Sequence, residues 1–326
     1  MSLVSSANSQ IRLRAKPLKV AVLSGGIGRE REVSIQSGRC VAEALKEAGF
    51  AVVTADIRPD NLSILDDGEI GVFFLALHGE FGEDGQLQQI LEEKSCLYTG
   101  SGPVASRRAF DKMASKRAFA EAGIATPPVI EFNSGTDIRE VEKQLNKLAS
   151  RYVVKPVRQG SSVGVGIFSS PREAVAAARK CLDEFGDCMI EKFVSGREIT
   201  VGILCGQPLP TIEIRTQMSF YDYHAKYVDE KTEFLFGTID DAVQEANIKA
   251  AAIDCFNSLG LRHFSRVDFI LGEDGVAYAL EVNTIPGFTS HSLLPRAAAK
   301  AGLSMSNLCV RIIEAALEDN RAKEPS

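Results

Sequence analysis

The sequence predicts a protein of several domains that joins an α/β domain to α+β domains. Its 326 residues exceed what one hydrophobic core usually organises, so two or three packed domains are expected. Over about the first 100 residues, continuously apolar strands alternate with an amphipathic helix, which is typical of a parallel sheet. Farther along, strands flank a glycine-rich loop without this regular alternation, which indicates α+β structure.

The α/β pattern occupies residues 17–105, after a polar, serine-rich tail over 1–16 that is expected to be disordered. An amphipathic helix that ends at Gly49 separates the first two strands. The apolar runs that predict the strands are Lys19–Leu23, Ala51–Ala55 and Val72–Leu77.

Two further domains are expected, at residues 106–192 and 193–326. The predicted helices are Ser106–Ala122, Arg172–Phe185, Asp240–Leu259 and Ser304–Leu317. The predicted strands are Tyr152–Lys155, Val165–Phe168, Cys188–Lys192, Glu198–Leu204 and Leu209–Arg215, followed by a hairpin over Ser265–Val282. The polar stretch 217–237 is long for an irregular segment of a compact domain, so a functional lid or a disordered loop is expected there.

Composition excludes several classes of protein. The formal net charge of −6 gives no reason to expect nucleic acid or an anionic membrane as a partner. The seven cysteines are scattered and include no Cys-x-x-Cys pair, so neither a disulfide framework nor a zinc site is expected. The longest apolar run, Val72–Leu77, is far shorter than the ~20 residues of a membrane span. A soluble cytoplasmic protein is expected.

The predicted hairpin carries the most informative polar residues. If Leu271 pairs with Val276 across the turn, Arg266 lies opposite Glu281 and Asp268 opposite Ala279. Side chains alternate along a strand, so four polar side chains project from one face: Arg266, Asp268, Glu281 and Asn283. Neighbouring carboxylates repel unless a cation lies between them, and oxygen ligands suit Mg²⁺. The alternative is a surface hairpin with ordinary ion pairs, but these residues interrupt otherwise apolar strands, which favours a site.

A glycine-rich loop over Arg158–Gly166 lies between two predicted strands. Its glycines allow close backbone approach, and successive N–H groups can cradle phosphate oxygens. Lys155, just before the loop, would add a positive charge for a phosphate. The loop lacks the Gly-Lys-Ser/Thr ending of a Walker loop, and a plain flexible turn is the alternative.

The first glycine cluster, Gly25-Gly26-Ile27-Gly28, resembles the start of a dinucleotide fingerprint. Arg31 stands where the third glycine belongs, and Glu30 and Glu32 would repel a pyrophosphate at the helix N-terminus. The acidic residues suit an ammonium group better than a phosphate.

Four other candidates are weak by themselves. Lys112 reads as a solvated surface lysine, and His78 follows the third strand at the end where open α/β sheets bind ligands. Ser161 and Ser292 read equally well as turn residues. The polar stretch also holds Tyr221, Tyr223 and Tyr227, which suits a lid or a small packed loop.

Together these segments resemble the D-alanine–D-alanine ligases of the ATP-grasp superfamily, from about Lys19 to Ala316. The matching strings are Gly25-Gly26, Glu30–Ser34, Ala76–Gly79, Gly82–Gly85, Tyr98–Gly102, Asp111-Lys112, Lys155-Pro156, Gly160–Gly164, Phe220–Tyr223, Ala225–Tyr227, Glu281–Thr284 and Pro286–Ser292. Because they occur in the family's order, the resemblance is highly specific.

The resemblance implies a three-domain ATP-grasp architecture, with ATP held between the central and C-terminal domains and the first domain contributing to substrate binding. It implies a homodimeric ligase that uses ATP and two Mg²⁺ (or Mn²⁺) ions. In the family's reaction, the carboxylate of one D-alanine attacks the γ-phosphate of ATP, and the amine of a second D-alanine displaces phosphate from the acyl phosphate. The product serves peptidoglycan precursor synthesis.

Residue roles follow from the same resemblance, position by position. Glu30 would bind the first ammonium and form a hydrogen-bonded set with Ser161 and Tyr227, and His78 would lie near the first substrate. Arg266 and the Gly287 N–H would form the oxyanion hole, and Ser292 would hold the second carboxylate. The implied metal ligands are Asp268, Glu281 and Asn283. The implied ATP contacts are Lys112, Lys155, Ser162, Glu191, Lys192, Val194, Glu198 and Lys226.

Two departures from the family pattern concern the lid. His224 stands where glutamate is common, and Leu235–Thr238 lacks the usual proline–alanine step. Tyr227 favours an amine acceptor, since relatives that make D-alanyl-D-lactate typically carry phenylalanine there. Two other functions are considered: a ligase that joins D-alanine to D-serine, and an inactive nucleotide-binding relative.

Overall fold

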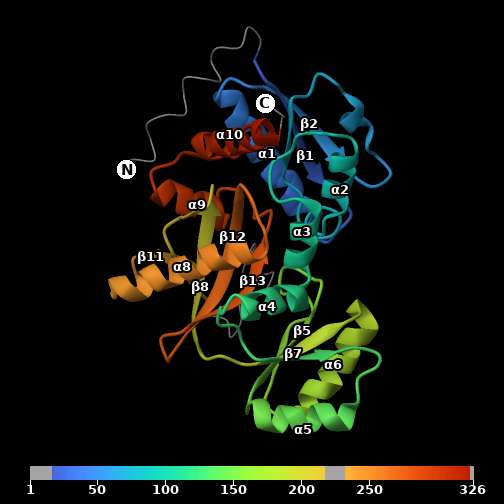
Figure 1. Ribbon diagram of the computed structural model, residues 1–326, viewed down its shortest axis with the longest axis vertical. Coiled ribbons are helices and arrows are strands. Elements are labelled where there is room, and N and C mark those ends of the chain that lie inside the picture. The colour runs from blue at the N-terminus through green and yellow to red at the C-terminus, as the bar shows by residue number, and fades with distance from the viewer. Residues whose placement is uncertain (1–16, 217–231, 324–326) are drawn as a thin grey trace.

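The computed structural model describes residues 17–216 and 232–323 of the chain (Figure 1). The tail 1–16 and most of the polar stretch 217–237, including His224, Lys226 and Tyr227, lie outside the described residues. The end of that stretch is not irregular, because Glu233–Phe236 forms a strand paired with Ile212–Arg215.

The described residues form three sheets with helices packed on them. The strands are β1 (Lys19–Gly25), β2 (Ala51–Ile57), β3 (Val72–Leu75), β4 (Val129–Phe132), β5 (Tyr152–Pro156), β6 (Gly166–Phe168), β7 (Cys188–Lys192), β8 (Gly196–Leu204), β9 (Gln207–Pro208), β10 (Ile212–Arg215), β11 (Glu233–Phe236), β12 (Phe264–Gly272) and β13 (Ala277–Asn283). The helices are α1 (Arg31–Glu47), η2 (Ser63–Asp66, a 3₁₀ turn), α2 (Gln86–Glu93), α3 (Pro103–Phe110), α4 (Lys112–Glu121), α5 (Ile138–Leu148), α6 (Pro171–Phe185), α8 (Ala242–Ser258), α9 (Leu293–Lys300) and α10 (Met305–Lys323). Within the described ranges, every helix is too short or too polar to cross a membrane.

The first sheet has the order β2-β1-β3, and both pairings are parallel, as predicted. Its strands β1 and β3 are buried because helices cover them: α1 packs on β1, and α10 packs against α1 (Figure 1). The edge strand β2 is partly exposed and contains the polar residues Thr54 and Asp56. Ser306 Oγ of α10 donates to the Ala44 carbonyl of α1 over 2.9 Å. The C-terminal helix therefore completes the core around the N-terminal sheet, and the carboxyl ends of β1 and β3 lead into the loops that carry Glu30 and His78.

The second sheet, β4-β7-β5-β6, is antiparallel and carries α5 and α6 on one face. The alternation along β5 divides its side chains between two environments. Tyr152 and Val154 are buried against the helices, whereas Val153 and Lys155 line a cavity on the opposite face.

The third sheet has the order β11-β10-β8-β12-β13, with β9 paired to β8. Ile199 and Val201 of β8 pack in a core with α8, so the residue between them, Thr200, points to the other face beside Asp268. The face of the second sheet opposite its helices and the part of the third sheet around Thr200 and Asp268 thus line the space in which the polar residues lie.

The predicted helix Ser106–Ala122 is wrong, because the chain forms two helices, α3 and α4, with a break at Asp111. Asp111 has an extended backbone, and its carboxylate caps α4 by accepting the Ala114 N–H over 2.9 Å. This cap competes with continuation of α3. The new helix begins at Lys112. Its side chain is buried and lines the cavity between the second and third sheets, and it does not lie on the surface.

The predicted register of the hairpin is also wrong. The loop is one residue longer than expected, so Leu271 pairs with Ala277 and not with Val276. A one-residue shift moves side chains to the opposite face of a strand. A β-bulge at Leu280 adds a second one-residue shift and restores the face, so that Asp268 lies opposite Glu281 and Arg266 opposite Asn283. The prediction that these four share one face is confirmed, although the expected partners were incorrect.

Candidate active site

A cavity of about 530 Å³ lies between the second and third sheets, within the ~300–1,000 Å³ range of small-molecule sites. Seven of the eight residues expected to contact ATP line it, from both sheets and from the glycine-rich loop: Lys112, Lys155, Ser162, Glu191, Lys192, Val194 and Glu198. The eighth, Lys226, lies outside the described residues. The structure therefore brings together residues that are dispersed over 87 positions of the sequence, from Lys112 to Glu198.

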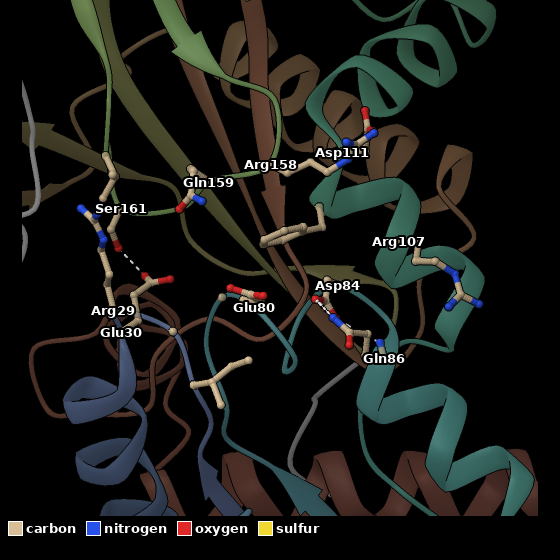
Figure 2. Close-up of a pocket in the computed structure, with 16 residues that line it drawn as sticks. Arg29, Glu30, Glu80, Asp84, Gln86, Arg107, Asp111, Arg158, Gln159 and Ser161 are labelled. Carbon is tan, nitrogen blue, oxygen red and sulfur yellow. Dashed lines mark hydrogen bonds and ion pairs between the residues drawn. The ribbon is translucent and has the colours of Figure 1, made fainter. Parts of the chain in front are cut away.

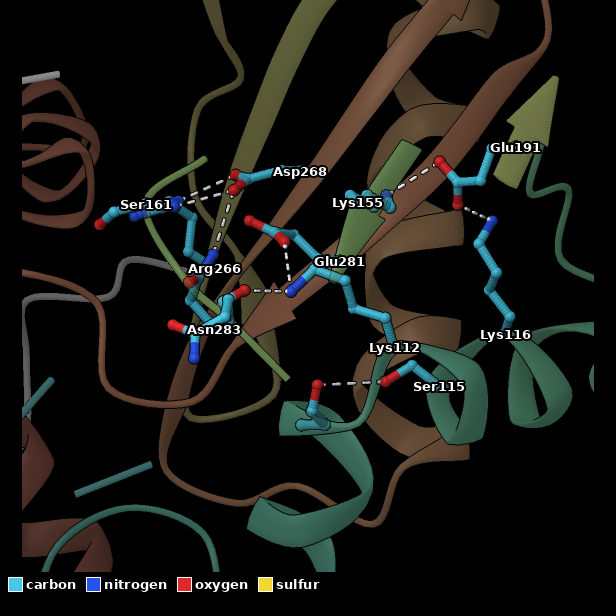
Figure 3. Close-up of polar contacts among 12 residues, drawn as sticks. Lys112, Ser115, Lys116, Lys155, Ser161, Glu191, Arg266, Asp268, Glu281 and Asn283 are labelled. Atoms are coloured by element: carbon cyan, nitrogen blue, oxygen red, sulfur yellow. Dashed lines mark hydrogen bonds and ion pairs between the residues drawn. The ribbon is translucent and has the colours of Figure 1, made fainter. Parts of the chain in front are cut away.

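A buried carboxylate between two lysines forms one wall of this cavity (Figure 3). Glu191, 2% exposed, lies 2.9 Å from Lys155 Nζ and 2.7 Å from Lys116 Nζ. Burial raises the pKa of Glu191, but the two ammonium groups outweigh burial, so its pKa lies below the usual range. The two ammonium groups therefore favour the charged form of Glu191, and the formal charges of the three side chains sum to +1 next to the cavity.

Lys116 is a residue that the sequence interpretation missed. Its ammonium also donates to Thr126 Oγ1 over 2.6 Å and to the Pro127 carbonyl over 3.0 Å. Burial lowers the pKa of Lys116 to about 8, against the opposing effect of Glu191. A signal was available, because Lys116 follows Lys112 by four residues and therefore lies on the same side of α4.

The expected metal ligands lie on one face of the β12–β13 pair, and protein cations neutralise their charges (Figure 3). Arg266 donates from Nε and Nη2 to the two oxygens of Asp268, each over 2.8 Å. Asn283 Nδ2 donates to the same carboxylate over 3.1 Å, and Lys112 Nζ lies 3.3 Å from Glu281 Oε2. Two carboxylates directly opposite each other are thus held between an arginine and a lysine.

The donor set on this face fits a hard cation. The described residues contain no group of three or more His, Cys, Asp or Glu side chains suited to a metal, so a site here would use two carboxylates and an amide oxygen. Mg²⁺ suits such a site, since it usually takes one or two protein carboxylates and fills its remaining positions with phosphate oxygens and water. Like charges on directly opposed residues, Asp268 and Glu281, also require positive charge between or beside them.

A second, small pocket adjoins this cavity, and all five residues expected to bind the amino-acid substrates line it. The two are called the nucleotide cavity and the amino-acid pocket after the ligands that the sequence leads us to expect there. They are Glu30, His78, Arg266, Gly287 and Ser292. Ser161 and Asn283 also line this pocket, together with Glu83, to which the sequence interpretation gave no role. Tyr227, the remaining catalytic candidate, lies outside the described residues.

Glu30 and Ser161 meet across this pocket, as the resemblance implied, because Ser161 Oγ donates to Glu30 Oε1. The loop approaches closely: a Cβ on Gly160 would lie only 2.9 Å from the Glu30 carboxylate. The glycine at 160 therefore permits the contact between Glu30, which follows the first glycine cluster, and the glycine-rich loop.

The turn after β13 carries Gly287 and Ser292. Ser292 Oγ accepts the Thr289 N–H over 3.0 Å and lies at the start of α9. A Cβ on Gly287 would lie 2.5 Å from Ser292 Oγ, closer than real Cβ contacts allow. Glycine at 287 thus lets the serine hydroxyl lie directly beside the backbone of the turn.

Gly287→Ala is expected to raise the KM for the amino-acid substrate about tenfold, because the new methyl group would displace Ser292 from the pocket. Such a displacement corresponds to about 1.4 kcal/mol of binding. Gly68→Ala is the matched control, since a Cβ there meets no atom within 4 Å. Steady-state kinetics of the two variants provide the comparison, and an unchanged KM in Gly287→Ala would contradict the assigned position of Ser292.

His78 and Glu83 connect the loop after β3 to this turn. His78 Nδ1 lies 2.8 Å from the Ile285 carbonyl, and Glu83 accepts the N–H groups of Gly79 over 2.8 Å and of Ile285 over 3.1 Å. Burial lowers the pKa of His78, so its imidazole is neutral. Burial and the nearby Glu30 carboxylate raise the pKa of Glu83 to about 8. His78 lies at the pocket, as expected, but its ring binds protein groups.

An open cleft of about 660 Å³ adjoins the Glu30–Ser161 contact (Figure 2). Both residues line the cleft and the amino-acid pocket. The charged side chains around the cleft include Arg29, Glu80, Asp84, Arg107, Asp111 and Arg158. Arg158 is paired with Asp111 over 2.7 Å, and the Asp84 carboxylate accepts the Phe81 and Gln86 N–H groups.

Two sheets that face each other across a lysine-lined nucleotide cavity, with a carboxylate pair on one of them, define the ATP-grasp class of ligases. The family model described as "D-ala D-ala ligase C-terminus" matches residues 118–314. A D-alanine–D-alanine ligase from Citrifermentans bemidjiense is 42% identical over 302 residues, which cover 92% of this chain and 97% of that protein. The chain therefore belongs to the D-alanine–D-alanine ligase family.

Solved structures agree with this membership. The D-alanine–D-alanine ligase from Bacillus anthracis complexed with ATP superposes with a TM-score of 0.82 at 31% identity, covering 94% of this chain and all of that one. The VanG D-Ala:D-Ser ligase from Enterococcus faecalis superposes with a TM-score of 0.80 at 27% identity, covering 92% of this chain and all of that one. The predicted ATP-grasp architecture is confirmed.

Proposed function

We propose that the protein joins two D-alanine molecules into D-alanyl-D-alanine, with conversion of ATP to ADP and phosphate, as a step of peptidoglycan precursor synthesis. One observation carries the proposal: the two cavities meet on neighbouring residue pairs of the β12–β13 hairpin. Asp268 and Glu281 line the nucleotide cavity, and Arg266 and Asn283, two residues along each strand, line the amino-acid pocket. Two residues along a strand span about 7 Å, so a terminal phosphate and an amino-acid carboxylate would lie next to each other.

In the first step, a carboxylate oxygen of the first D-alanine attacks the γ-phosphorus, and the bond to the β-phosphate oxygen breaks. Glu30 would hold the ammonium of this substrate, with Ser161 and Tyr227 as its partners. Lys112, Lys155 and Lys226 would neutralise charge on the phosphates. Glu191 and the backbone of Lys192 and Val194 would bind adenine, Glu198 the ribose, and Ser162 the phosphates through the glycine-rich loop.

In the second step, the amine nitrogen of the second D-alanine attacks the acyl carbon, and phosphate leaves as the amide forms. Arg266 and the Gly287 N–H would donate to the oxyanion of the tetrahedral intermediate, where charge develops. Ser292 would hold the carboxylate of the second substrate. Exclusion of water from the pocket that these groups line would protect the acyl phosphate from hydrolysis.

Asp268, Glu281 and Asn283 would hold two Mg²⁺ or Mn²⁺ ions, which when bound neutralise charge on the phosphates. The residues Arg266 and Lys112 already neutralise these carboxylates in the protein alone. These two cations therefore leave neither Asp268 nor Glu281 as an unpaired buried charge when no metal ion is bound.

Phosphate release tests the function directly. Purified protein with ATP, Mg²⁺ and D-alanine alone is expected to release phosphate and form the dipeptide, and no turnover under these conditions would overturn the proposal. A D-serine acceptor is the second candidate, favoured by the likeness to the D-Ala:D-Ser ligase. Competition between D-serine and D-alanine, with the products separated by chromatography, decides between them.

Glu281→Ala is expected to lower kcat at least about a hundredfold, because removing a metal ligand withdraws charge stabilisation from the phosphoryl group. The Mg²⁺ concentration for half-maximal activity should rise in the same variant. Glu273→Ala in the turn of the same hairpin is the control, since this exposed carboxylate accepts the Ser195 hydroxyl over 2.9 Å and lines neither cavity. Unchanged ATP-dependent activity in Glu281→Ala would refute the metal site. Activity of the wild type would by itself exclude the alternative of an inactive nucleotide-binding relative.

The homodimeric state and the cytoplasmic location implied by the resemblance stay predictions. Light scattering of the purified protein is expected to give twice the mass of the 326-residue chain.

A further inference from the structure

Ser37 is a buried residue of α1 that links three segments far apart in the sequence. Its side chain has no solvent exposure. Its Oγ accepts the Phe288 N–H over 3.1 Å and lies 3.0 Å from His78 Nε2. Ser37 and Phe288 are separated by 251 positions, yet they meet directly beside the turn that carries Gly287.

The direction of every hydrogen bond in this chain of contacts is determined. The Ile285 carbonyl accepts only, so His78 Nδ1 must carry the hydrogen and donate to it. The imidazole is neutral because burial lowers its pKa, so Nε2 has no hydrogen and accepts. Ser37 therefore donates its hydroxyl hydrogen to His78 and uses its oxygen lone pair for the Phe288 N–H. Replacement by alanine would leave two buried polar groups without this partner.

The turn is held at three backbone groups by side chains of the N-terminal part of the chain. Ser37 binds the Phe288 N–H, His78 binds the Ile285 carbonyl, and Glu83 binds the Ile285 N–H. The Phe288 ring adds edge contacts to Phe74 and Phe264, with ring centroids 5.4 and 5.5 Å away. These contacts flank Gly287 in the sequence, at Ile285 on one side and at Phe288 on the other.

We propose that Ser37 is a positioning residue for the second step of the reaction, which holds the turn 285–288 so that the Gly287 N–H and Ser292 receive the second amino acid. This inference rests on the proposed function of that turn. The side chain of Ser37 contacts the backbone of the turn, and Ser37 lines neither the amino-acid pocket nor the nucleotide cavity. Its effect is therefore expected in the second step and not in ATP binding or in acyl-phosphate formation.

The chain offers a matched control one helical turn earlier. Ser34 is as fully buried as Ser37 and has the same hydrogen-bond pattern, because its Oγ accepts the Gly25 N–H over 2.8 Å and donates to the Ala76 carbonyl over 2.8 Å. Both partners of Ser34 belong to the N-terminal sheet and its loops. Ser34→Ala and Ser37→Ala thus remove equivalent hydrogen bonds, but only the second substitution releases the turn 285–288.

The experiment compares the two steps in the full-length wild type, Ser37→Ala and Ser34→Ala. Hydroxylamine, which intercepts an acyl phosphate as a hydroxamate, measures the first step, and dipeptide formation measures the second. Ser37→Ala is expected to raise the KM for the second D-alanine and to lower kcat of dipeptide formation, so that kcat/KM falls about tenfold. This is the effect expected from weakening one oxyanion contact. Its hydroxamate rate and its KM for ATP should stay within about twofold of the wild type, a difference small against the ~1.4 kcal/mol of a tenfold effect.

Ser34→Ala is expected to lower the melting temperature as Ser37→Ala does. The ratio of the hydroxamate rate to the rate of dipeptide formation should stay as in the wild type. Equal losses in both steps, or the same kinetic change in both variants, would make Ser37 a purely structural residue and overturn the inference. If Ser37→Ala does not fold, Ser37→Cys keeps the shape of the side chain with a somewhat larger atom that forms weaker hydrogen bonds, and an unchanged second-substrate KM there overturns the inference equally. Failure of the proposed function itself is distinct, because the wild type would then form no dipeptide.

Discussion

Arg266→Met is expected to lower kcat by about a hundredfold to a thousandfold, the usual effect of removing one oxyanion donor. The guanidinium lines the amino-acid pocket and makes two 2.8 Å hydrogen bonds to Asp268. Methionine preserves the side-chain length but supplies no donor. Because the nearly buried Asp268 also loses its charged partner, the free energy of unfolding should fall by about 3 kcal/mol.

Two controls separate the loss of the donor from a general effect of removing arginine. Arg266→Lys keeps the positive charge without the two-pronged geometry and should give an intermediate kcat. Arg262→Met removes a partly buried arginine that donates to the Gly100 carbonyl away from the site, and it should leave kcat unchanged. Pre-steady-state kinetics and urea unfolding provide the measurements. A kcat within tenfold of the wild type in Arg266→Met would exclude Arg266 as an oxyanion donor.

Lys116→Met is expected to destabilise the protein by about 3 kcal/mol and to raise the KM for ATP. The substitution leaves the buried Glu191 carboxylate with one cation instead of two, and an incompletely compensated buried charge is costly. The net charge of the lysine–carboxylate group would fall from positive to neutral, which weakens attraction for the phosphates. Arg117→Met, next in the sequence, removes an exposed arginine 3.9 Å from Glu131 and should change stability by less than about 1 kcal/mol.

The pH dependence provides a second measurement of Lys116. Its pKa is about 8 in the folded protein and 10.5 as a free side chain, so the unfolded chain binds more protons between these values. Stability contributed by this residue therefore rises with pH from about 8 to 10.5, and Lys116→Met should lack that rise. In the wild type, the KM for ATP should increase above pH 8, as Lys116 loses its charge. A KM profile identical in wild type and variant would contradict this role.

The hairpin illustrates how far strand periodicity carries a prediction. Placing Arg266, Asp268, Glu281 and Asn283 on one face required only that side chains alternate along a strand. The partners were wrong, because the loop has one more residue than the turn sequence indicated and Leu280 forms a bulge. The two shifts cancel in their effect on the face. A bulge depends on contacts outside the strand in which it lies. Here the Ala125 carbonyl accepts the Ala279 N–H over 2.8 Å beside the bulge, and periodicity within the hairpin does not reveal such a contact.

The break at Asp111 shows the opposite case, in which a local signal was present but incompletely used. Aspartate before a helical segment is a favoured N-cap, and here it divides the predicted helix 106–122 into α3 and α4. The break directs Lys112 and Lys116 into the protein. The solvated-surface interpretation of Lys112 was therefore wrong, since only 8% of the residue is exposed.

By itself, the sequence determined the ligase family, the parallel N-terminal sheet and the shared face of the hairpin. Motif order and strand periodicity are properties of the chain that need no knowledge of distant contacts. Only the tertiary structure decided that the two cavities meet on the β12–β13 pair, and that Glu83, Lys116 and Ser37 make buried contacts beside them. The physical reason is that each of these residues has a partner 75 to 251 positions away, namely Glu191 for Lys116, Ile285 for Glu83 and Phe288 for Ser37, and no local pattern specifies such partners.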